Sequence, residues 1–468
     1  MDNYNFLIPL NSVDTGMLAL ICINETPQFH KLVKIDGEID GTSLNKALSA
    51  VLKAHPNLSA KTCTRHMRPF RKIVDATESN MVTYLNLSDA SPADGGADLR
   101  YEEALSEWVN RPFDPFQEFP VRVLFIKKAS SESHLVFSFD HSSLDGIRSL
   151  RFIEEVVKIY NGGAQPEPSF LDELRRSKGD ELLGFAGSQR AICKSFYRKV
   201  FTSLFHRFLI RPLNPPSRVF HDKSEQRSVT AHLMGNINQA EMDRIQSKAK
   251  AAGFTINDVL LAACFRVTQK WNNLHHKAVG KVSIMVPVNL GPESFRDVIS
   301  NQLSYVSLSA SPRESSDPLV LLRKIRKDMR SMVAGGVPFS MIYFLHFVSY
   351  APLPLLKALA RLLMSIPVQV DTIMLTNMGL IWPEAVREEQ MGGSRIKDVA
   401  ALNPVVTPMG QSITIHSNHG SLHVCLGYKT GLFSKEKAQQ FLDMYLEEVR
   451  SLPSHVFQLQ SSLPLNKK

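Results

Sequence analysis

The spacing of apolar residues predicts alternating strands and helices in the first third of the chain. A strand is expected over 31–39, followed by a helix over 42–55 whose leucine, alanine and valine residues share one face. Segments 120–127 and 134–140 alternate with period two, which is typical of neighbouring strands. A helix over 146–160 follows, and the Asn-Gly-Gly sequence after it is a common helix C-terminal signal.

The second half of the chain repeats this alternation. A hairpin is expected over 412–428, because the sequence Asn418-His-Gly420 is typical of a tight turn between strands. The other expected elements are helices over 238–252, 256–271, 355–364 and 434–450 and a strand over 281–287. Mixed sheets with helices, formed twice along the chain, predict an α/β or α+β fold.

A proline-rich break divides the chain. Three prolines within 211–218 exclude a continuous helix or a central strand there. We therefore expect two lobes, 1–180 and 229–468, joined by a basic helical linker over 181–228. The linker contains an amphipathic helix predicted over 189–210, with apolar residues every four positions opposite lysine and arginine.

The positive charge is concentrated in this linker. The chain carries a formal net charge of +9, and segment 186–228 holds nine Lys/Arg against two acidic residues, or +7. Such a segment suits an anionic membrane, nucleic acid, CoA phosphates or an acidic carrier protein, or it is a solvated face. We interpret it as covering the protein's own body, with peripheral membrane contact as the alternative and no role in nucleic-acid binding.

The composition of the 468-residue chain is that of a globular protein, with 44% apolar and 21% charged residues. Its five cysteines are scattered and form no CxxC pair, which favours a reducing compartment. The N-terminus has no basic segment before an apolar run, and no stretch of 18 apolar residues occurs. We expect a cytoplasmic monomer.

Several common catalytic motifs are absent from the sequence. It contains no GxSxG elbow, no GxxxxGK[ST] phosphate loop, no GxGxxG after a strand and no HExxH. Three histidines, His416, His419 and His423, could bind zinc. A polar sheet face or a substrate-channel wall explains them better, and no metal site is expected.

The segment His141-Ser-Ser-Leu-Asp145-Gly146 is the strongest candidate for chemistry. His141 directly follows a predicted buried strand, so its side chain is held at a sheet edge. A neutral imidazole can accept a proton from a hydroxyl or amine at physiological pH. Asp145 suits a loop-holding role, through an arginine or backbone amides, or a simple N-cap. Gly146 is expected to permit a tight turn.

Segments 113–122, 134–139 and 140–146 together resemble the core of the HxxxD acyltransferase superfamily. That superfamily includes chloramphenicol acetyltransferase, condensation domains of peptide synthetases, polyketide-associated acyltransferases and wax ester synthases. Further similar segments follow in the same order along the chain, at 55–58, 255–262, 286–290 and 375–379.

The resemblance implies two chloramphenicol-acetyltransferase-like lobes with a tunnel between them and His141 midway. It also implies that His141 is the general base, that Asp145 is mainly structural and that no acyl-enzyme forms. The expected reaction moves an acyl group from acyl-CoA or an acyl carrier protein thioester to a hydroxyl acceptor, without a further cofactor. The remaining candidates are Arg122, Asn257 and Asp258 as structural residues and Asn377, Gly379, Ser412 and His416 as channel residues.

Two departures from the family pattern bear on this expectation. Asp140 stands where condensation domains usually have a first histidine, and Ser59 stands where the arginine partner of Asp145 is usual. We therefore expect Arg122 or Arg65 to replace that arginine. The alternatives to ester formation are amide formation on an amine acceptor and an inactive relative that binds acyl ligands or partners.

The apolar segment 339–368 also bears on the substrate. Core packing explains most such stretches, but this one could also line a pocket for a long acyl chain or rest on a membrane surface. Hydrophobic substrates are therefore favoured.

Overall fold

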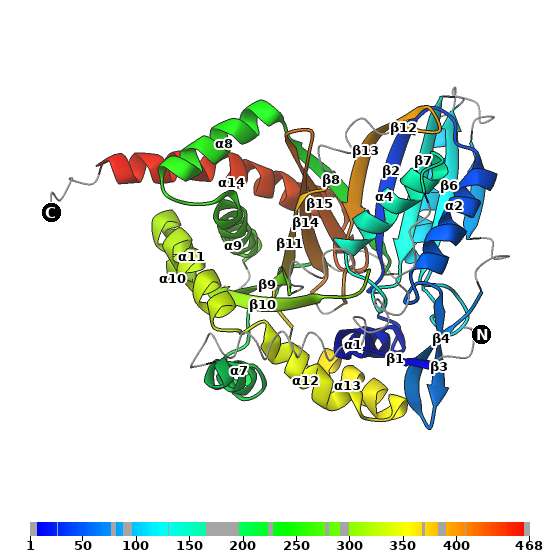
Figure 1. Cartoon of the computed structure of the whole chain (residues 1–468). Coiled ribbons are helices and arrows are strands. Elements are labelled where there is room, and N and C mark those ends of the chain that lie inside the picture. The colour runs from blue at the N-terminus through cyan, green and yellow to red at the C-terminus, as the bar shows by residue number, and fades with distance from the viewer. Residues whose placement is uncertain are drawn as a thin grey trace.

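A computed structural model describes residues 7–25, 27–75, 81–87, 96–129, 131–164, 196–222, 228–276, 280–290, 299–366, 370–381, 390–407 and 409–462. Two six-stranded mixed sheets lie side by side, each covered by helices (Figure 1). This arrangement confirms the α/β fold class that the alternation of apolar positions predicts.

The N-terminal sheet forms the first lobe. Its strands, in spatial order, are β12 (Gln390–Met391), β13 (Ser394–Leu402), β2 (Phe29–Asp36), β7 (Glu132–Phe139), β6 (Val121–Ala129) and β5 (Val82–Asn86). Helices α2 (Gly41–Ala54) and α4 (Arg148–Tyr160) bury their apolar faces against one side, and α3 (Gly96–Asn110) covers the other. The antiparallel pairing of β6 with β7 confirms the two neighbouring strands expected from period-two alternation.

The C-terminal sheet forms the second lobe. Its strands, in spatial order, are β10 (Leu303–Ala310), β9 (Val282–Asn289), β11 (Ile373–Leu380), β14 (Gln411–Asn418), β15 (Ser421–Lys429) and β8 (Thr230–Ile237). The strands β14 and β15 confirm the predicted hairpin, with His416 opposite His423. One face is covered by α8 (Gln239–Ala251), α9 (Ile256–Leu274), α10 (Pro312–Ser316), α11 (Pro318–Ala334) and α14 (Lys435–Ser462).

Capping residues place the helices of this second lobe. Asn238 and Glu241 form a capping box at the start of α8, where the sequence predicts a helix from residue 238. At α9 the N-cap is Thr255, and Asp258 completes its capping box. Of the two structural candidates at this helix start, Asp258 takes part in the cap, and the N-cap lies two residues before Asn257.

One strand of the first sheet comes from the second half of the chain. The strand β13 pairs antiparallel with β2 along its length, from Arg395 opposite Asp36 to Leu402 opposite His30 (Figure 1). The division of the chain at residues 180 and 229 did not anticipate this exchange. The two lobes are therefore joined by sheet hydrogen bonds as well as by the linker.

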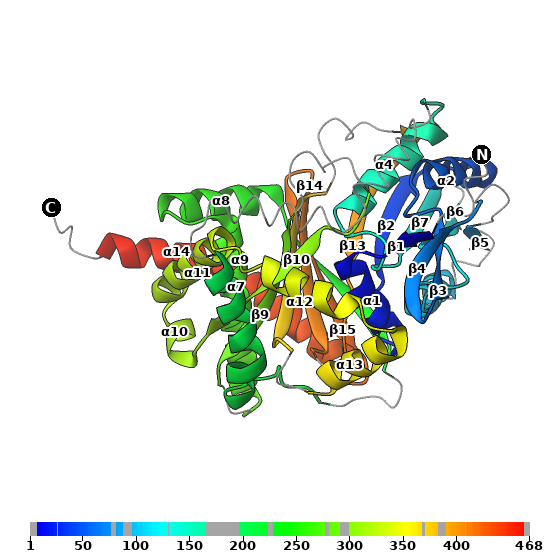
Figure 2. The same cartoon turned by 60° about the horizontal axis from the view of Figure 1, so that its bottom comes forward.

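A layer of helices closes one side of the junction between the lobes. It consists of α1 (Ser12–Ile21), which packs against α12 (Phe339–Ser349) and α13 (Leu353–Ser365) (Figure 2). Beside α1 lies a small sheet of β1 (Leu7–Pro9), β4 (Arg68–Ile73) and β3 (Ala60–Arg65), which the sequence analysis missed. Helix α13 confirms the helix expected over 355–364.

Residues 196–213 of the linker are helical, and residues 214–222 have no regular secondary structure. The helix α7 (Phe196–Phe205) continues as a π-helical turn, η3 (His206–Ile210), and a 3₁₀ turn, η4 (Arg211–Leu213). Residues 189–195 of the predicted linker helix lie outside the described residues. Within the described part of the chain no single helix is long and apolar enough to span a membrane. Two bent pairs, α8 with α9 and α11 with α12, meet that test by length and composition only.

A substitution at Leu402 of β13 tests whether this strand stabilises the junction of the two lobes. Its side chain is 4% exposed and packs against Val109 of the first lobe and Cys425 of the second. We expect Leu402→Ala to lower the free energy of unfolding by about 2–5 kcal/mol, because it leaves a cavity at the lobe junction. Chemical denaturation measures this. Leu99→Ala, at a position 61% exposed, is the control and should change stability by no more than about 0.5 kcal/mol; equal losses would contradict the coupling.

Candidate active site

His141 lies in the loop that follows β7, at the junction of the two lobes. Its side chain is 8% exposed and its ring packs edge-on against Phe29, with ring centroids 4.9 Å apart. Nδ1 is enclosed and has no hydrogen-bond partner among the described residues. Burial lowers the pKa of His141, and the charge of Asp145 and nearby backbone groups partly oppose this. The ring is therefore neutral at physiological pH, as a proton acceptor must be.

The main chain around His141 is held by hydrogen bonds from several elements. The Asp140 carboxylate accepts from the backbone N–H of Ser142 at 2.8 Å and from its hydroxyl at 2.9 Å. Asn301, from the second lobe, donates its side-chain N–H to the carbonyl of His141 at 2.7 Å. Arg71 of β4 donates to the carbonyl of Ser142. Asp140 is thus occupied in shaping the loop.

Asp145 belongs to the same loop, is fully enclosed and does not line the cavity beside His141. Its Oδ1 accepts from the backbone N–H groups of Ile147 and Arg148, both at 3.0 Å. Its Oδ2 accepts from the backbone N–H of Gln302 at 3.1 Å, and an Nη atom of Arg148 lies 3.6 Å away. The carboxylate thus accepts from backbone N–H groups before and at the start of α4 and from one of the second lobe; its loop-holding role stays a prediction.

The arginine assigned to Asp145 from the sequence was wrong. Arg122 points elsewhere, because its guanidinium pairs with Glu118 at 3.1 Å and lies 4.1 Å from the ring centre of Phe113. Arg65 lies at the exposed end of β3. The arginine beside Asp145 is Arg148, one helical turn along, which also donates to Asn289 at 3.0 Å and Gln302 at 2.7 Å. Its i,i+3 spacing from Asp145 was the signal available in the sequence.

Arg71, which the sequence did not single out, also holds the loop through the carbonyl of Ser142. Its Nη2 is 3.1 Å from Asp14 of α1, and its Nη1 donates to the carbonyl of Asn57 at 3.0 Å. Both charged side chains are buried. Burial raises the pKa of Asp14 to about 7, against the opposing charge of Arg71. The pair ties α1, β4 and the His141 loop together.

A buried lysine lies close to the loop. Lys31 of β2 is 1% exposed, and its Nζ donates to the sulfur of Met378 at 3.2 Å. Burial lowers the pKa of Lys31 to about 7, with the charge of Asp145 opposing. A side chain at Gly146 would contact Met378 and lie 4.0 Å from Nζ of Lys31. These are ordinary van der Waals distances and Gly146 does not have a positive φ, so the expected tight turn does not require glycine here.

Two of the predicted channel residues come together at the surface. The amide of Asn377 donates to the side chain of Asn257 at 3.2 Å and accepts from the backbone N–H of Gly379 at 3.0 Å. Gly379 has a φ of 68° next to a bulge in β11. Neither Asn377 nor Gly379 lines the cavity beside His141.

The other two channel candidates, Ser412 and His416, lie in different places. Ser412 lines the cavity beside His141 and donates its hydroxyl to the carbonyl of Pro404 at 3.0 Å. His416 is fully enclosed between the lobes and stacks on His423, with ring centroids 5.0 Å apart. Burial lowers the pKa of His416 to about 3. Parallel rings do not converge on a metal, and the described residues contain no group of three metal-ligand side chains.

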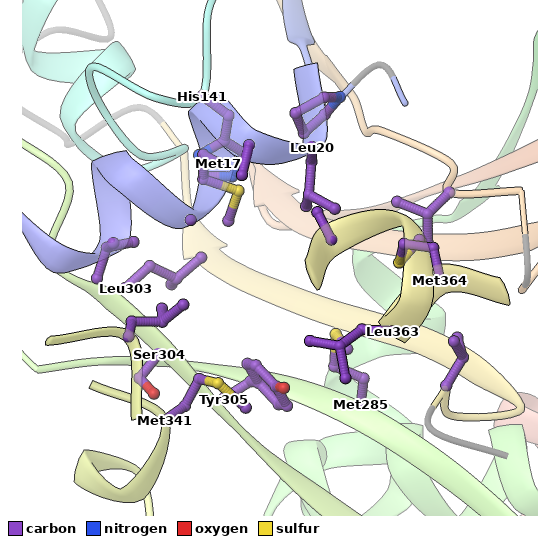
Figure 3. A pocket seen from close by; sticks show the side chains of 18 of the residues that line it. Met17, Leu20, His141, Met285, Leu303, Ser304, Tyr305, Met341, Leu363 and Met364 are labelled. Carbon is purple, nitrogen blue, oxygen red and sulfur yellow. The ribbon is translucent and has the colours of Figure 1, made fainter. Parts of the chain in front are cut away.

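An apolar cavity of about 310 Å³ begins at His141 and lies between the lobes. Its walls come from α1, α12, α13 and the uncovered face of β9 and β10, and they are almost entirely hydrocarbon. Figure 3 shows His141 at one end, with Leu363 and Met364 of α13 toward one side and Tyr305 and Met341 toward another. The imidazole thus lies at the end of a largely hydrophobic chamber.

The condensation domain family model matches residues 8–467, nearly the whole chain. This protein belongs to the condensation domain family. The match confirms the resemblance to the HxxxD superfamily that segments 113–122 and 140–146 indicated. This condensation domain keeps the histidine, aspartate and glycine of the motif and has Asp140 at the first position.

The curated relatives cover different parts of this condensation domain. The uncharacterized protein Rv2305 of Mycobacterium tuberculosis is 28% identical over 207 residues, 42% of this chain and 44% of that protein. A linear gramicidin synthase of Brevibacillus parabrevis is 22% identical over 468 residues, 96% of this chain and 6% of that protein. The chain therefore spans less than half the length of either relative.

Solved condensation domains share the fold. The first condensation domain of the CDA synthetase aligns with a TM-score of 0.69 and 14% identity over 97% of both chains. A mutant starter condensation domain of rhizomide synthetase, in complex with C8-CoA and Leu-SNAC, aligns with a TM-score of 0.66 and 13% identity over 98% of both chains. The condensation domain of the Monacolin K polyketide synthase MokA aligns at 0.68, with 14% identity over 96% of this chain and 98% of that one. These alignments confirm the two-lobed fold.

The buried amine of Lys31 makes stability depend on pH in a defined window. Because its pKa falls from 10.5 to about 7 on burial, the unfolded chain binds a proton between these values that the folded chain does not. Lys31 therefore destabilises the folded protein increasingly as the pH falls toward 7, by at most roughly 1.4 kcal/mol per pH unit. Lys31→Met should gain stability relative to the native protein as the pH falls from about 10 to about 7.

Thermal or chemical denaturation across that pH range measures the difference. The control is the same substitution at Lys46, which is exposed on α2, where the difference from the native protein should stay constant. A constant difference for Lys31→Met as well would show that the buried amine remains charged.

Proposed function

We propose that this protein transfers an acyl group from a thioester, acyl-CoA or a carrier-protein thioester, to a hydroxyl acceptor, with His141 as general base. The observation that carries the proposal is the position of a buried, neutral imidazole at the end of a hydrophobic cavity between two lobes. Members of the family transfer acyl or aminoacyl groups, and the rhizomide synthetase starter domain was solved in complex with C8-CoA.

The chemical step conserves atoms and charge without an acyl-enzyme. Nε2 of His141 takes the proton of the acceptor hydroxyl as the oxygen attacks the thioester carbonyl. Nδ1 is enclosed, so we assign the proton transfer to Nε2. The tetrahedral intermediate collapses, the C–S bond breaks, and the imidazolium returns the proton to the departing thiolate. Products are an ester and a free thiol.

The loop geometry supports this role for His141 and a supporting one for Asp145. Asp145 has its oxygens occupied by three backbone N–H groups and does not line the cavity, so it holds the loop and does not touch substrate. Asp140 is likewise occupied by Ser142. His141 is therefore the titratable side chain that this loop presents to the chamber.

Removal of the imidazole is the direct test. Thiol release from a panel of acyl-CoAs and carrier thioesters, with alcohol and amine acceptors, should fall at least about a hundredfold in His141→Ala, since the general base supplies a factor of about 10²–10⁴. The control is His276→Asn, at an exposed histidine with a positive φ that asparagine tolerates. Unchanged turnover in a folded His141→Ala protein would refute the proposal, and turnover with amines alone would replace ester by amide formation.

The hydrocarbon walls favour a long acyl chain. Leu356, Leu359, Leu363 and Met364 of α13 line the cavity. Burial of a methylene contributes about 0.8 kcal/mol, so each added carbon that fits should raise affinity several-fold. The segment 339–368, in which the sequence showed an excess of apolar residues, supplies both α12 and α13 of this wall.

A bulky residue on α13 should shorten the accepted chain. Leu363→Trp fills the cavity and is expected to lower kcat/KM for palmitoyl-CoA by at least about tenfold, while acetyl-CoA turnover changes little. Leu362→Trp is the matched control, because the neighbouring side chain is 56% exposed and does not line the cavity. Native protein that turns over acetyl- and palmitoyl-CoA equally would contradict the chain-length preference.

A further inference from the structure

A second cavity, of about 970 Å³, adjoins the chamber at His141. It lies between the uncovered face of β9 and β10, the α11 helix and the linker turns α7, η3 and η4. Arg207, Tyr305 and Met341 line both cavities. A molecule that reaches from His141 into the second cavity would pass these three residues.

The sheet face beneath the two cavities changes from apolar to polar along its strands. At the His141 end, the outward residues Met285, Pro287, Leu303 and Tyr305 line the first cavity. Farther along, Ser283, Ser307 and Ser309 line the second. The register places Ser309 opposite Ser283 and Tyr305 opposite Pro287, so the polar positions form one contiguous patch. The face is hydrocarbon near His141 and carries serine hydroxyls farther along, where Ser283 and Ser307 donate to Asp371.

The second cavity is strongly cationic. Two of its cations are neutralised by acids: Arg211 pairs with Asp371 at 2.8 Å, and Lys324 pairs with Asp328 at 2.9 Å and Glu314 at 3.6 Å. The other cationic lining residues are Arg198, Lys199, Arg207 and Lys281.

Three of these cations, Arg198, Lys199 and Lys281, form no ion pair with an acid among the described residues. Arg207 stacks over the ring of Tyr305, 4.9 Å from its centre, where the two cavities meet. Burial lowers the pKa of Lys281, and the neighbouring cations Arg211 and Lys324 act in the same direction, against the weaker opposing charges of Glu314 and Asp371. Partly buried like charges repel in the absence of an anion, so the cavity is built for an anionic ligand.

We propose that this cavity binds the phosphates of CoA, with the pantetheine arm passing Tyr305 to present the thioester at His141. The inference rests on the proposed acyl transfer and specifies its donor. A carrier protein would place one phosphodiester here, with a single negative charge. CoA instead carries a diphosphate, which adds one negative charge, and a 3′-phosphate monoester of about −1.5 to −2. The cluster of Arg198, Lys199, Arg207 and Lys281 matches the larger charge. The acyl chain then lies on the α13 side of the first cavity.

Calorimetric titration of the native protein with free CoA, dephospho-CoA and pantetheine tests this without turnover. CoA should bind most tightly, pantetheine most weakly, and added salt should weaken CoA binding. Lys281→Ala and Lys199→Ala should each weaken CoA binding by about tenfold or more and reduce the advantage of CoA over pantetheine. Lys281→Arg should restore most of the affinity.

The matched control is Lys327→Ala, at an exposed lysine on α11 that does not line the cavity, and it should bind CoA as the native protein does. Thermal melting confirms that each variant is folded. Equal affinity for CoA in Lys281→Ala, Lys199→Ala and native protein, or equal affinity of the native protein for CoA and pantetheine, overturns the assignment.

The failure of this inference is distinguishable from the failure of the proposed function. His141-dependent turnover of carrier thioesters, with no measurable CoA binding, refutes the CoA site and leaves acyl transfer standing. CoA binding that depends on Lys281, with turnover that His141→Ala does not reduce, supports the site and refutes the general base.

Discussion

The hydrogen bonds that hold the loop of residues 140–147 come from both lobes, and the placement of His141 depends on them. Asp145 accepts from Gln302 across the lobe junction, and Asn301 donates to the carbonyl of His141. Arg71 reaches the same loop from the small sheet. A shift of one lobe against the other would break these bonds, so the geometry of the imidazole depends on how the two halves of the chain fit together.

The loop of residues 140–147 is surrounded by buried ionisable side chains, and their burial costs folding free energy. Asp14, Asp140, Asp145, Lys31 and Arg71 are all enclosed near one loop. Each carboxylate is hydrogen-bonded, whereas the hydrogen-bond acceptor of Lys31 among the described residues is a thioether, and its pKa falls accordingly. A buried polar group with a poor partner costs free energy. The protein retains these groups where the loop needs a fixed shape, beside the proposed reacting centre.

The local elements could be predicted from the sequence because they depend on local signals. The capping box of Asn238 and Glu241, the pairing of β6 with β7 and the register of His416 with His423 all follow from short-range spacing. Contacts between distant segments could not be found this way. The i,i+3 spacing of Asp145 and Arg148 could have predicted their proximity. Lys31 and Arg71 come near the loop only through tertiary packing, which local spacing does not predict. The same limit concealed β13, because nothing local in 394–402 distinguishes a strand of one lobe from a strand of the other.

The position of β13 also has a consequence for biosynthesis. During translation β2 remains an unpaired edge of the first sheet until Leu402 has left the ribosome, because its partner is encoded more than three hundred residues later. Such an edge, with Leu32 and Val33 at its centre, is a template for intermolecular pairing. The first lobe therefore cannot complete its folding as an independent cotranslational unit, and newly made chains depend on a late, long-range closure to protect that edge.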